Sequence, residues 1–170
     1  MSELGIPADY ARSRGMPCQA EAARLVAVGT NSTGREVLLA PVAAGAWFRM
    51  RDAAASQGIT LLAISGFRSV ARQEEIIRAK LAAGETIDSI LKVNAAPGYS
   101  EHHTGRAVDI GVPDEPPLEE GFALTQAFSW LTAHAREFGF ALSYACGNPQ
   151  GIAYEPWHWL YADADDGARG

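Results

Sequence analysis

The chain has 170 residues, of which 48% are hydrophobic and 20% are charged, and its formal net charge is −6. This length and composition are typical of one globular domain with a buried core. The negative charge, without any lysine–arginine cluster, argues against a nucleic-acid-binding surface. No apolar run approaches the roughly 20 residues that a membrane-spanning helix needs. We therefore expect a folded domain that neither binds nucleic acid nor spans a membrane.

The two ends of the chain differ from its middle. Residues 1–24 show no strong periodicity and predict an irregular N-terminal arm, residues 25–161 a folded domain, and residues 162–170 a frayed acidic tail. The arm lacks the basic and then apolar order of a signal peptide, which leaves the cytosol, another export route and a trimmed chain as alternatives. Cys18 and Cys146 are compatible with one disulfide or with two buried thiols.

The pattern of apolar residues and turns predicts strands and helices in mixed order. Strands are expected at residues 25–28, 36–40, 59–64, 107–111, 140–144 and 152–161, and helices at residues 43–57, 70–82, 87–91 and 124–138. Thr86 is the expected N-cap of the third helix. The β-branched, apolar run at 59–64 predicts a central strand buried on both faces. No regular βαβ rhythm appears, so the sequence predicts a single α+β domain with a small central antiparallel sheet flanked by helices.

Two segments concentrate residues that can bind a metal ion. Residues 97–110 place His102 and Asp109 seven positions apart, and residues 154–159 add Glu155 and His158. A catalytic zinc ion takes three protein ligands, with imidazole and carboxylate both suitable, and keeps one position for water. The candidate ligands of one zinc ion are therefore His102, Asp109 and His158. No self-contained motif such as HExxH is present, so spacing alone leaves unrelated structural residues as an equal alternative.

Glu155 lies three residues before His158, so in an extended chain the two side chains would point to opposite faces. Pro156 is poorly tolerated inside a paired strand. We therefore expect a bend at Pro156 and Trp157 that brings Glu155 beside the metal as a general base.

Each candidate also has a plain structural alternative. Asp109 could cap the end of a strand. Arg68, just past the predicted strand at 59–64, could face a cleft, lie at the surface or neutralise Glu155. The other two histidines, His103 and His134, are expected to be core or surface residues without a catalytic role.

The motifs resemble those of the VanY-type D-alanyl-D-alanine carboxypeptidases, which are zinc peptidases of peptidoglycan. The resemblance runs from about residue 58 to 161 in matching order. It is carried by Ser65-Gly66-Phe67-Arg68-Ser69 with Gln73, by Ser100-x-His102-x-x-Gly105-x-Ala107-x-Asp109, by the stretch from Trp130 to Tyr144, and by Glu155-Pro-Trp-His158. Four motifs in the same order make the resemblance specific.

The resemblance implies a hedgehog/DD-peptidase-like fold, with residues 25–161 as the zinc carboxypeptidase domain. It implies that the chain is a zinc metallopeptidase with one Zn²⁺, which cuts peptidoglycan stem peptides or their precursors before the terminal D-alanine. We expect a monomer. A place in the cell envelope is implied by the family, while the missing signal peptide keeps the cytoplasm open. The expected roles are metal ligands at His102, Asp109 and His158, catalysis by Glu155 and Arg68, and substrate contacts at Ser100, Gln73 and Tyr99.

Related activities remain open alternatives. An L,D-carboxypeptidase or a stem-peptide endopeptidase would have the same fold, and a non-catalytic zinc-containing binding domain is a further alternative, against which Glu155 and Arg68 argue. Two departures from the family pattern bear on specificity. Leu160 stands where members often have arginine, and residues 145–150 replace a short turn.

Overall fold

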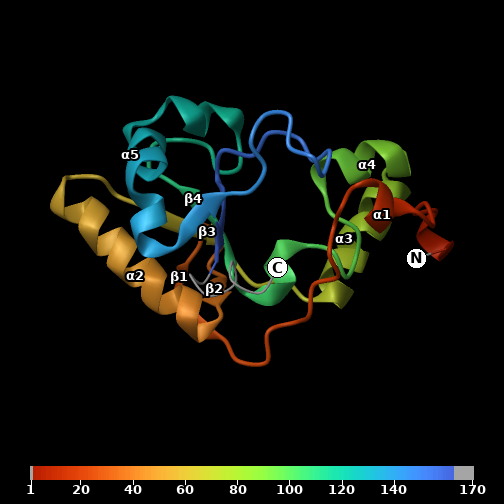
Figure 1. The fold of residues 1–170 in the computed structure, drawn as a ribbon, viewed down its shortest axis with the longest axis horizontal. Coiled ribbons are helices and arrows are strands. Elements are labelled where there is room, and N and C mark those ends of the chain that lie inside the picture. The colour runs from red at the N-terminus through yellow and green to blue at the C-terminus, as the bar shows by residue number, and fades with distance from the viewer. Residues whose placement is uncertain (1, 163–170) are drawn as a thin grey trace.

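The computed structural model describes residues 2–162 and contains two antiparallel sheets (Figure 1). In one sheet, β1 (Val26–Thr30) pairs with β2 (Glu36–Leu39). The other has the strand order β3-β4-β6-β5, formed by β3 (Leu62–Ser65), β4 (Ala107–Gly111), β5 (Phe140–Leu142) and β6 (His158–Tyr161). The predicted α+β domain with a small antiparallel sheet is therefore confirmed. The predicted acidic tail lies outside the described residues, except for Ala162.

The principal helices are α2 (Pro41–Ser56), α3 (Val70–Ala82), α4 (Ile87–Val93) and α5 (Gln126–His134). Shorter turns of helix are η1 (Ser2–Leu4), α1 (Tyr10–Ser13), η2 (Glu101–Thr104), η3 (Glu120–Leu124) and η4 (Ala135–Phe138). The predicted N-cap at Thr86 is confirmed, because its side chain accepts a hydrogen bond from the backbone N–H of Ser89. Among residues 2–162, no helix has the length and apolar character that crossing a bilayer requires.

Two clusters of buried apolar side chains hold these elements together. The larger one packs α2 and α5 against the four-stranded sheet, with Trp47, Leu131 and Phe140 among its largest members. The smaller one joins α3 and α4 to the N-terminal segment, from which Leu4, Ile6, Tyr10 and Met16 are buried. Figure 1 shows α2 and α5 at one end of the molecule and α1, α3 and α4 at the other. The first 24 residues therefore contribute side chains to a core, and the division into arm and domain stays a prediction.

The prediction of a central strand at residues 59–64 is wrong. β3 is an edge strand that starts at Leu62, whose residue surface is 37% exposed, and it pairs only with β4. Leu61 and Ala63, on either side of Leu62 in the chain, face the core. On the edge of β3 that does not pair with β4, the side chain of Asn31 donates a hydrogen bond to the Ile64 carbonyl. The apolar run therefore reflects one face packed on the core and an outer edge that is partly covered by Asn31. The central strands are β4, buried along its whole length, and β6.

Three other predicted bounds also needed correction. The helix expected at 43–57 is α2, which begins two residues earlier at Pro41, where the missing N–H of proline costs nothing. The helix expected at 124–138 is α5 followed by the 3₁₀ turn η4, and it ends at Gly139, whose φ of +84° suits glycine. The strand expected at 152–161 is shortened to β6, because the chain turns at Pro156 and Trp157.

Gly66, directly after β3, lies so close to β2 that a larger residue does not fit. A Cβ atom there would overlap the carbonyl oxygen of Leu38, which accepts a hydrogen bond from the Phe67 N–H at 2.7 Å, and would lie 3.1 Å from Leu39 Cδ2. We expect Gly66→Ala to lower the free energy of unfolding by about 1–3 kcal/mol, as overpacking does.

Denaturant unfolding monitored by circular dichroism measures this change. Gly29→Ala is the matched control, because nothing lies within 4 Å of a Cβ at that position. Its effect should stay within about 0.5 kcal/mol. Equal stabilities of the two variants would contradict the close approach at Gly66.

Candidate active site

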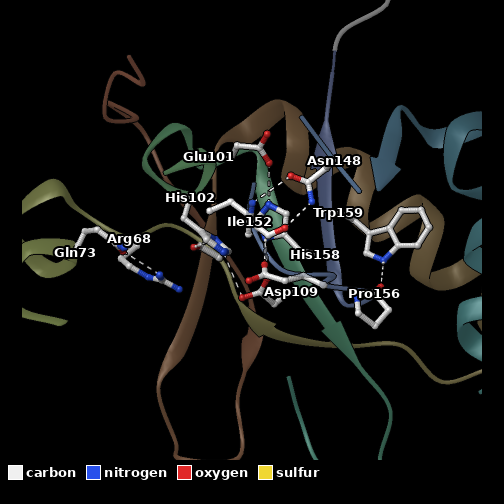
Figure 2. A network of polar contacts seen from close by, with 12 residues as sticks. Arg68, Gln73, Glu101, His102, Asp109, Asn148, Ile152, Pro156, His158 and Trp159 are labelled. Atoms are coloured by element: carbon white, nitrogen blue, oxygen red, sulfur yellow. Dashed lines mark hydrogen bonds and ion pairs between the residues drawn. The ribbon is translucent and has the colours of Figure 1, made fainter. Parts of the chain in front are cut away.

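Two of the predicted ligands come from adjacent central strands. Asp109 on β4 and His158 on β6 are directly paired across the sheet, so their side chains lie on the same face. Val108 and Ile110 point to the larger core, and alternation along β4 therefore turns Asp109 to the opposite face. The Nδ1 atom of His158 lies 3.0 Å from Asp109 Oδ1 (Figure 2), and both residues are buried.

The third predicted ligand, His102, is held by the loop that follows β3. Its Nδ1–H donates to the Gly66 carbonyl at 2.7 Å, and its own carbonyl accepts from the Arg68 N–H at 3.1 Å. This arrangement turns Nε2 toward Asp109 Oδ2, which is 3.3 Å away. Gly105 ends the η2 turn with φ +64°, and a Cβ there would lie 2.8 Å from the Ala40 nitrogen. The glycine of the motif is thus required by a close backbone contact.

The donor set fits a zinc ion. His102, Asp109 and His158 each offer one ligand atom, and these atoms all lie within 4.8 Å of one another. Ligand atoms about 2.0–2.1 Å from a tetrahedral zinc ion stand about 3.3 Å apart, close to the separations present here. Two imidazoles and one carboxylate are ordinary zinc ligands. The three residues can therefore hold the metal that the sequence predicts.

The protonation states of the metal-free site follow from burial and mutual contact. Burial alone would raise the pKa of Asp109, but the charge and hydrogen bonds of His102 and His158 outweigh it and hold that pKa well below its usual range. Burial lowers the pKa of His102 despite the attraction of Asp109. Burial would also lower the pKa of His158, yet its hydrogen bonds to Asp109 and Glu101 raise it to about 10. Metal binding must therefore displace a proton from His158.

Glu155 reaches the site through the expected bend. The His158 N–H donates to the Glu155 carbonyl at 3.1 Å, and the Trp159 indole N–H donates to the Pro156 carbonyl at 3.0 Å (Figure 2). The turn brings Glu155 Oε2 to 3.9 Å from His158 Nδ1, on the metal side of the ring. Burial raises the pKa of Glu155 to about 7. A carboxylate with this pKa, beside a metal site, is suited to accept and return a proton near neutral pH.

Arg68 and Gln73 form a pair in which only the arginine reaches the cleft. Arg68 Nη1 donates to Gln73 Oε1 at 3.0 Å, and Gln73 Nε2 donates to the Ala95 carbonyl at 2.7 Å. Gln73 is fully buried and both ends of its amide are engaged. Its position favours a role in orienting Arg68 over the direct substrate contact expected from the sequence.

A cleft of about 360 Å³ opens over the candidate metal site. It is lined by the three candidate ligands with Arg68, Ser100 and Glu155, and further by Lys80, Leu118, Glu120, Ile152 and Tyr154 among others. Tyr99 and Gln73 are not among the lining residues. Tyr99 instead packs edge-on against Tyr10, with ring centroids 5.7 Å apart, beside the smaller core cluster. The structure thus brings together all the predicted site residues except these two.

The two histidines expected to be structural have structural surroundings. His103 is fully buried, its Nδ1–H donates to the Arg68 carbonyl at 2.6 Å, and its Nε2 accepts from the Gly98 N–H at 3.1 Å. His134 lies on α5 and contacts Glu137 at 2.9 Å on the surface.

The two departures from the family pattern lie outside the metal set. In the segment 145–150, the Asn148 side chain donates to the carbonyls of Ala145 and Ile152, which fixes the turn that brings Ile152 to the cleft (Figure 2). Leu160 is paired within the sheet and does not line the cleft. Cys18 and Cys146 are free and exposed, which differs from both alternatives that the sequence left open, a disulfide and two buried thiols.

Sequence reasoning missed two residues that contact His158. The Oε2 atom of Glu101 lies 2.8 Å from His158 Nε2, and the Tyr144 ring stacks on the imidazole with centroids 4.7 Å apart. In an extended chain Glu101 would point away from His102, and only the tight η2 turn brings both to the site. The one signal was an acidic residue inside the first motif.

Comparisons with known proteins identify the family of this chain. The family model described as "VanY: D-alanyl-D-alanine carboxypeptidase" matches residues 36–164. The protein YodJ of Bacillus subtilis (strain 168) is 38% identical over 124 residues, which are 70% of this chain and 44% of that protein. This chain therefore spans less than half the length of that relative.

Solved structures of two carboxypeptidases are also similar. The LdcB LD-carboxypeptidase superposes with a TM-score of 0.75 at 32% identity, covering 85% of this chain and 71% of the other. A variant of the vancomycin-resistance D,D-pentapeptidase VanY from a VanB-type cassette, solved with Zn(II), gives a TM-score of 0.65 at 25% identity, covering 86% of this chain and 82% of the other. With the family model matching most of the described residues, this chain belongs to the VanY family of D-alanyl-D-alanine carboxypeptidases.

Proposed function

We propose that this chain is a zinc-dependent D-alanyl-D-alanine carboxypeptidase that removes the terminal D-alanine from peptidoglycan stem peptides or their precursors. One observation carries the proposal: Glu155 lies 3.9 Å from a buried ligand set of His102, Asp109 and His158, at the floor of an open cleft. The zinc-bound relative of the same family supports the choice of metal. We expect the protein to act as a monomer on a peptide substrate.

The chemistry divides between the metal and the residues around it. His102, Asp109 and His158 would hold the zinc ion, which would supply a bound water with a pKa of about 7 and a positive charge to polarise the scissile carbonyl. Glu155 accepts the proton of the attacking water and later delivers it to the leaving amine. Arg68 donates its fixed fork of N–H groups to the developing oxyanion or to the terminal carboxylate of the substrate. Ser100, buried at the cleft wall, is placed to contact the substrate backbone.

The test is alanine release from a stem pentapeptide ending in D-alanyl-D-alanine, followed by mass spectrometry. We expect release that stops with a chelator and returns when zinc is added back. A tetrapeptide stem is the second arm, because similarity to LdcB makes L,D-carboxypeptidase activity the second candidate. Cleavage of the tetrapeptide alone would reassign the enzyme, and internal cleavage would indicate an endopeptidase. No cleavage of any stem by zinc-loaded protein would favour a binding domain.

Arg68→Ala is expected to lower kcat/KM by about 10²–10³-fold while zinc affinity stays unchanged, because its guanidinium contacts substrate and not the metal. Steady-state kinetics and zinc content measure the two effects. A loss mainly in kcat would indicate oxyanion stabilisation, and a rise mainly in KM would indicate carboxylate binding. Arg72→Ala is the matched control, since Arg72 lies near Arg68 in the chain, at the start of α3, and is exposed and paired with Glu75. Equal activities of the two variants would exclude Arg68 from the mechanism.

A further inference from the structure

The carboxylate of Glu101 has no part in the chemistry proposed above, yet it is held against a candidate metal ligand. Its Oε2 atom lies 2.8 Å from Nε2 of His158, and its side chain is only 16% exposed. A largely buried carboxylate in contact with a buried imidazole is held in a defined position, because burying it without a hydrogen bond would be costly.

The two nitrogens of the His158 ring face different neighbours. Nδ1 faces Asp109 Oδ1 at 3.0 Å and Glu155 Oε2 at 3.9 Å, whereas Nε2 faces Glu101 (Figure 2). A neutral imidazole has one N–H and one lone pair. If the hydrogen is on Nε2 and is donated to Glu101, the lone pair is on Nδ1. That is the nitrogen on the side of Asp109, where the metal would bind.

We propose that Glu101 is a positioning residue that holds His158 with its hydrogen on Nε2 and its lone pair on Nδ1, and so strengthens metal binding. This inference rests on the proposed function, because it requires that the site binds zinc. A carboxylate on the far nitrogen of a ligating histidine both fixes the ring and makes it a better donor.

The other contacts of the two ligand histidines fit this role for Glu101. In His102 a backbone carbonyl fixes which nitrogen carries the hydrogen: its Nδ1–H donates to the Gly66 carbonyl, and this leaves the Nε2 lone pair for the metal. Tyr144 stacks on the face of the His158 ring at an interplanar angle of 29°. Such a contact restrains the ring plane but cannot choose between the two nitrogens. Two carboxylates contact the ring, Asp109 at Nδ1 and Glu101 at Nε2. Because Asp109 is itself a candidate metal ligand, Glu101 is the carboxylate that stays free to hold the hydrogen on Nε2 when a metal is bound.

The first measurement is zinc affinity, by competition with a chromophoric chelator. We expect Glu101→Ala to weaken zinc binding by about 10–100-fold, the range typical for removing a residue that hydrogen-bonds to a metal ligand. Glu101→Gln keeps an acceptor oxygen but loses the charge, so its loss should be smaller. Glu137→Gln is the matched control, because Glu137 also contacts a histidine, His134, at 2.9 Å but on the surface. It should bind zinc as tightly as the wild type.

The second measurement reports the histidine itself. In long-range ¹H–¹⁵N spectra of the zinc-loaded protein, the Nε2–H of His158 should be a downfield, slowly exchanging signal. In Glu101→Ala that signal should move upfield and exchange faster. The Nδ1–H of His102, held by Gly66, should not change and serves as an internal reference. A general loss of packing would affect both histidines, so only a selective change at His158 supports positioning by Glu101.

The outcomes separate this inference from the proposed function. Failure of the wild type to bind zinc would contradict the proposed function. The inference alone would be overturned if the wild type binds zinc and Glu101→Ala binds it with an affinity within about threefold of the wild type. Such a change is well short of the loss typical when the partner of a ligating histidine is removed. If the alanine variant does not fold, the Gln variant carries the test. Zinc affinity in Glu101→Gln equal to that of Glu137→Gln would then overturn it.

Discussion

Replacing His158 with alanine is expected to abolish stoichiometric zinc binding and, with it, peptide hydrolysis. In the proposed site His158 supplies one of three ligand atoms, and the two remaining ligands would hold zinc far more weakly than three. The loss of affinity should exceed the about 10–100-fold effect of changing a residue that only supports a ligand, because a direct ligand is removed. Metal analysis after gel filtration and alanine release from the pentapeptide measure the two effects.

The same substitution should also change the stability of the metal-free protein. His158 is 2% exposed and lies between Asp109 and Glu101, so its removal leaves one buried and one largely buried carboxylate without their shared cation. Removing one partner of a buried pair typically costs about 3–5 kcal/mol. The variant is therefore best compared with the wild type at low temperature, where both remain folded.

The stability of the metal-free wild type should depend on pH in a defined direction. The pKa of His158 is raised from 6.5 to about 10 in the folded state by its hydrogen bonds. Its contribution to stability is thus fully present below pH 6.5 and is lost as the pH rises toward 10. His158→Ala should lack this loss, whereas the surface control His134→Ala should keep it. Undiminished zinc binding by His158→Ala would exclude the proposed ligand set.

The sequence was sufficient to predict the parts of the site that depend on local pattern. The candidate metal ligands stand in two short motifs, and the bend at Pro156 follows from the poor fit of proline in a paired strand. The helices α3 and α4 begin directly after their N-cap residues, Ser69 and Thr86, whose side chains accept hydrogen bonds from backbone N–H groups. These features need no knowledge of distant contacts.

What could not be predicted depends on contacts between distant segments. The apolar run of β3 fits an edge strand as well as a central one, and only the pairing of β4 with β6 decides between them. Gln73 matched the family motif, but its amide is taken by Arg68 and by Ala95, 22 residues away along the chain. The contact of Glu101 with His158 spans 57 residues. No periodicity within one segment could have indicated it.

Glu155→Gln is expected to retain zinc and lose about 10²–10⁴-fold in kcat/KM, the contribution typical of a general base. An amide of the same size fills the same space but cannot accept the proton of the attacking water. Burial raises the pKa of the carboxyl to about 7, so its ionised form is costly in the metal-free fold. That cost is absent below pH 4.5 and grows as the pH rises toward 7. Above pH 7 the neutral Gln variant should therefore be at least as stable as the metal-free wild type. A loss of activity in this variant can then be assigned to the missing base and not to unfolding.

The pH dependence of kcat/KM gives the second test of Glu155. In the zinc-loaded wild type, the added positive charge lowers the pKa of this carboxyl, so activity should fall only as the pH drops below 7 and the base becomes protonated. The residual activity of Glu155→Gln should lack this acid limb, because no base remains to be protonated. Glu75→Gln, which changes an exposed carboxylate on α3, is the control. It should keep the wild-type kcat/KM and the wild-type fall of activity at acid pH. Turnover of Glu155→Gln near that of the wild type would rule out Glu155 as the base, because a solvent-assisted route could not replace a buried carboxylate 3.9 Å from the ligand set at no cost in rate.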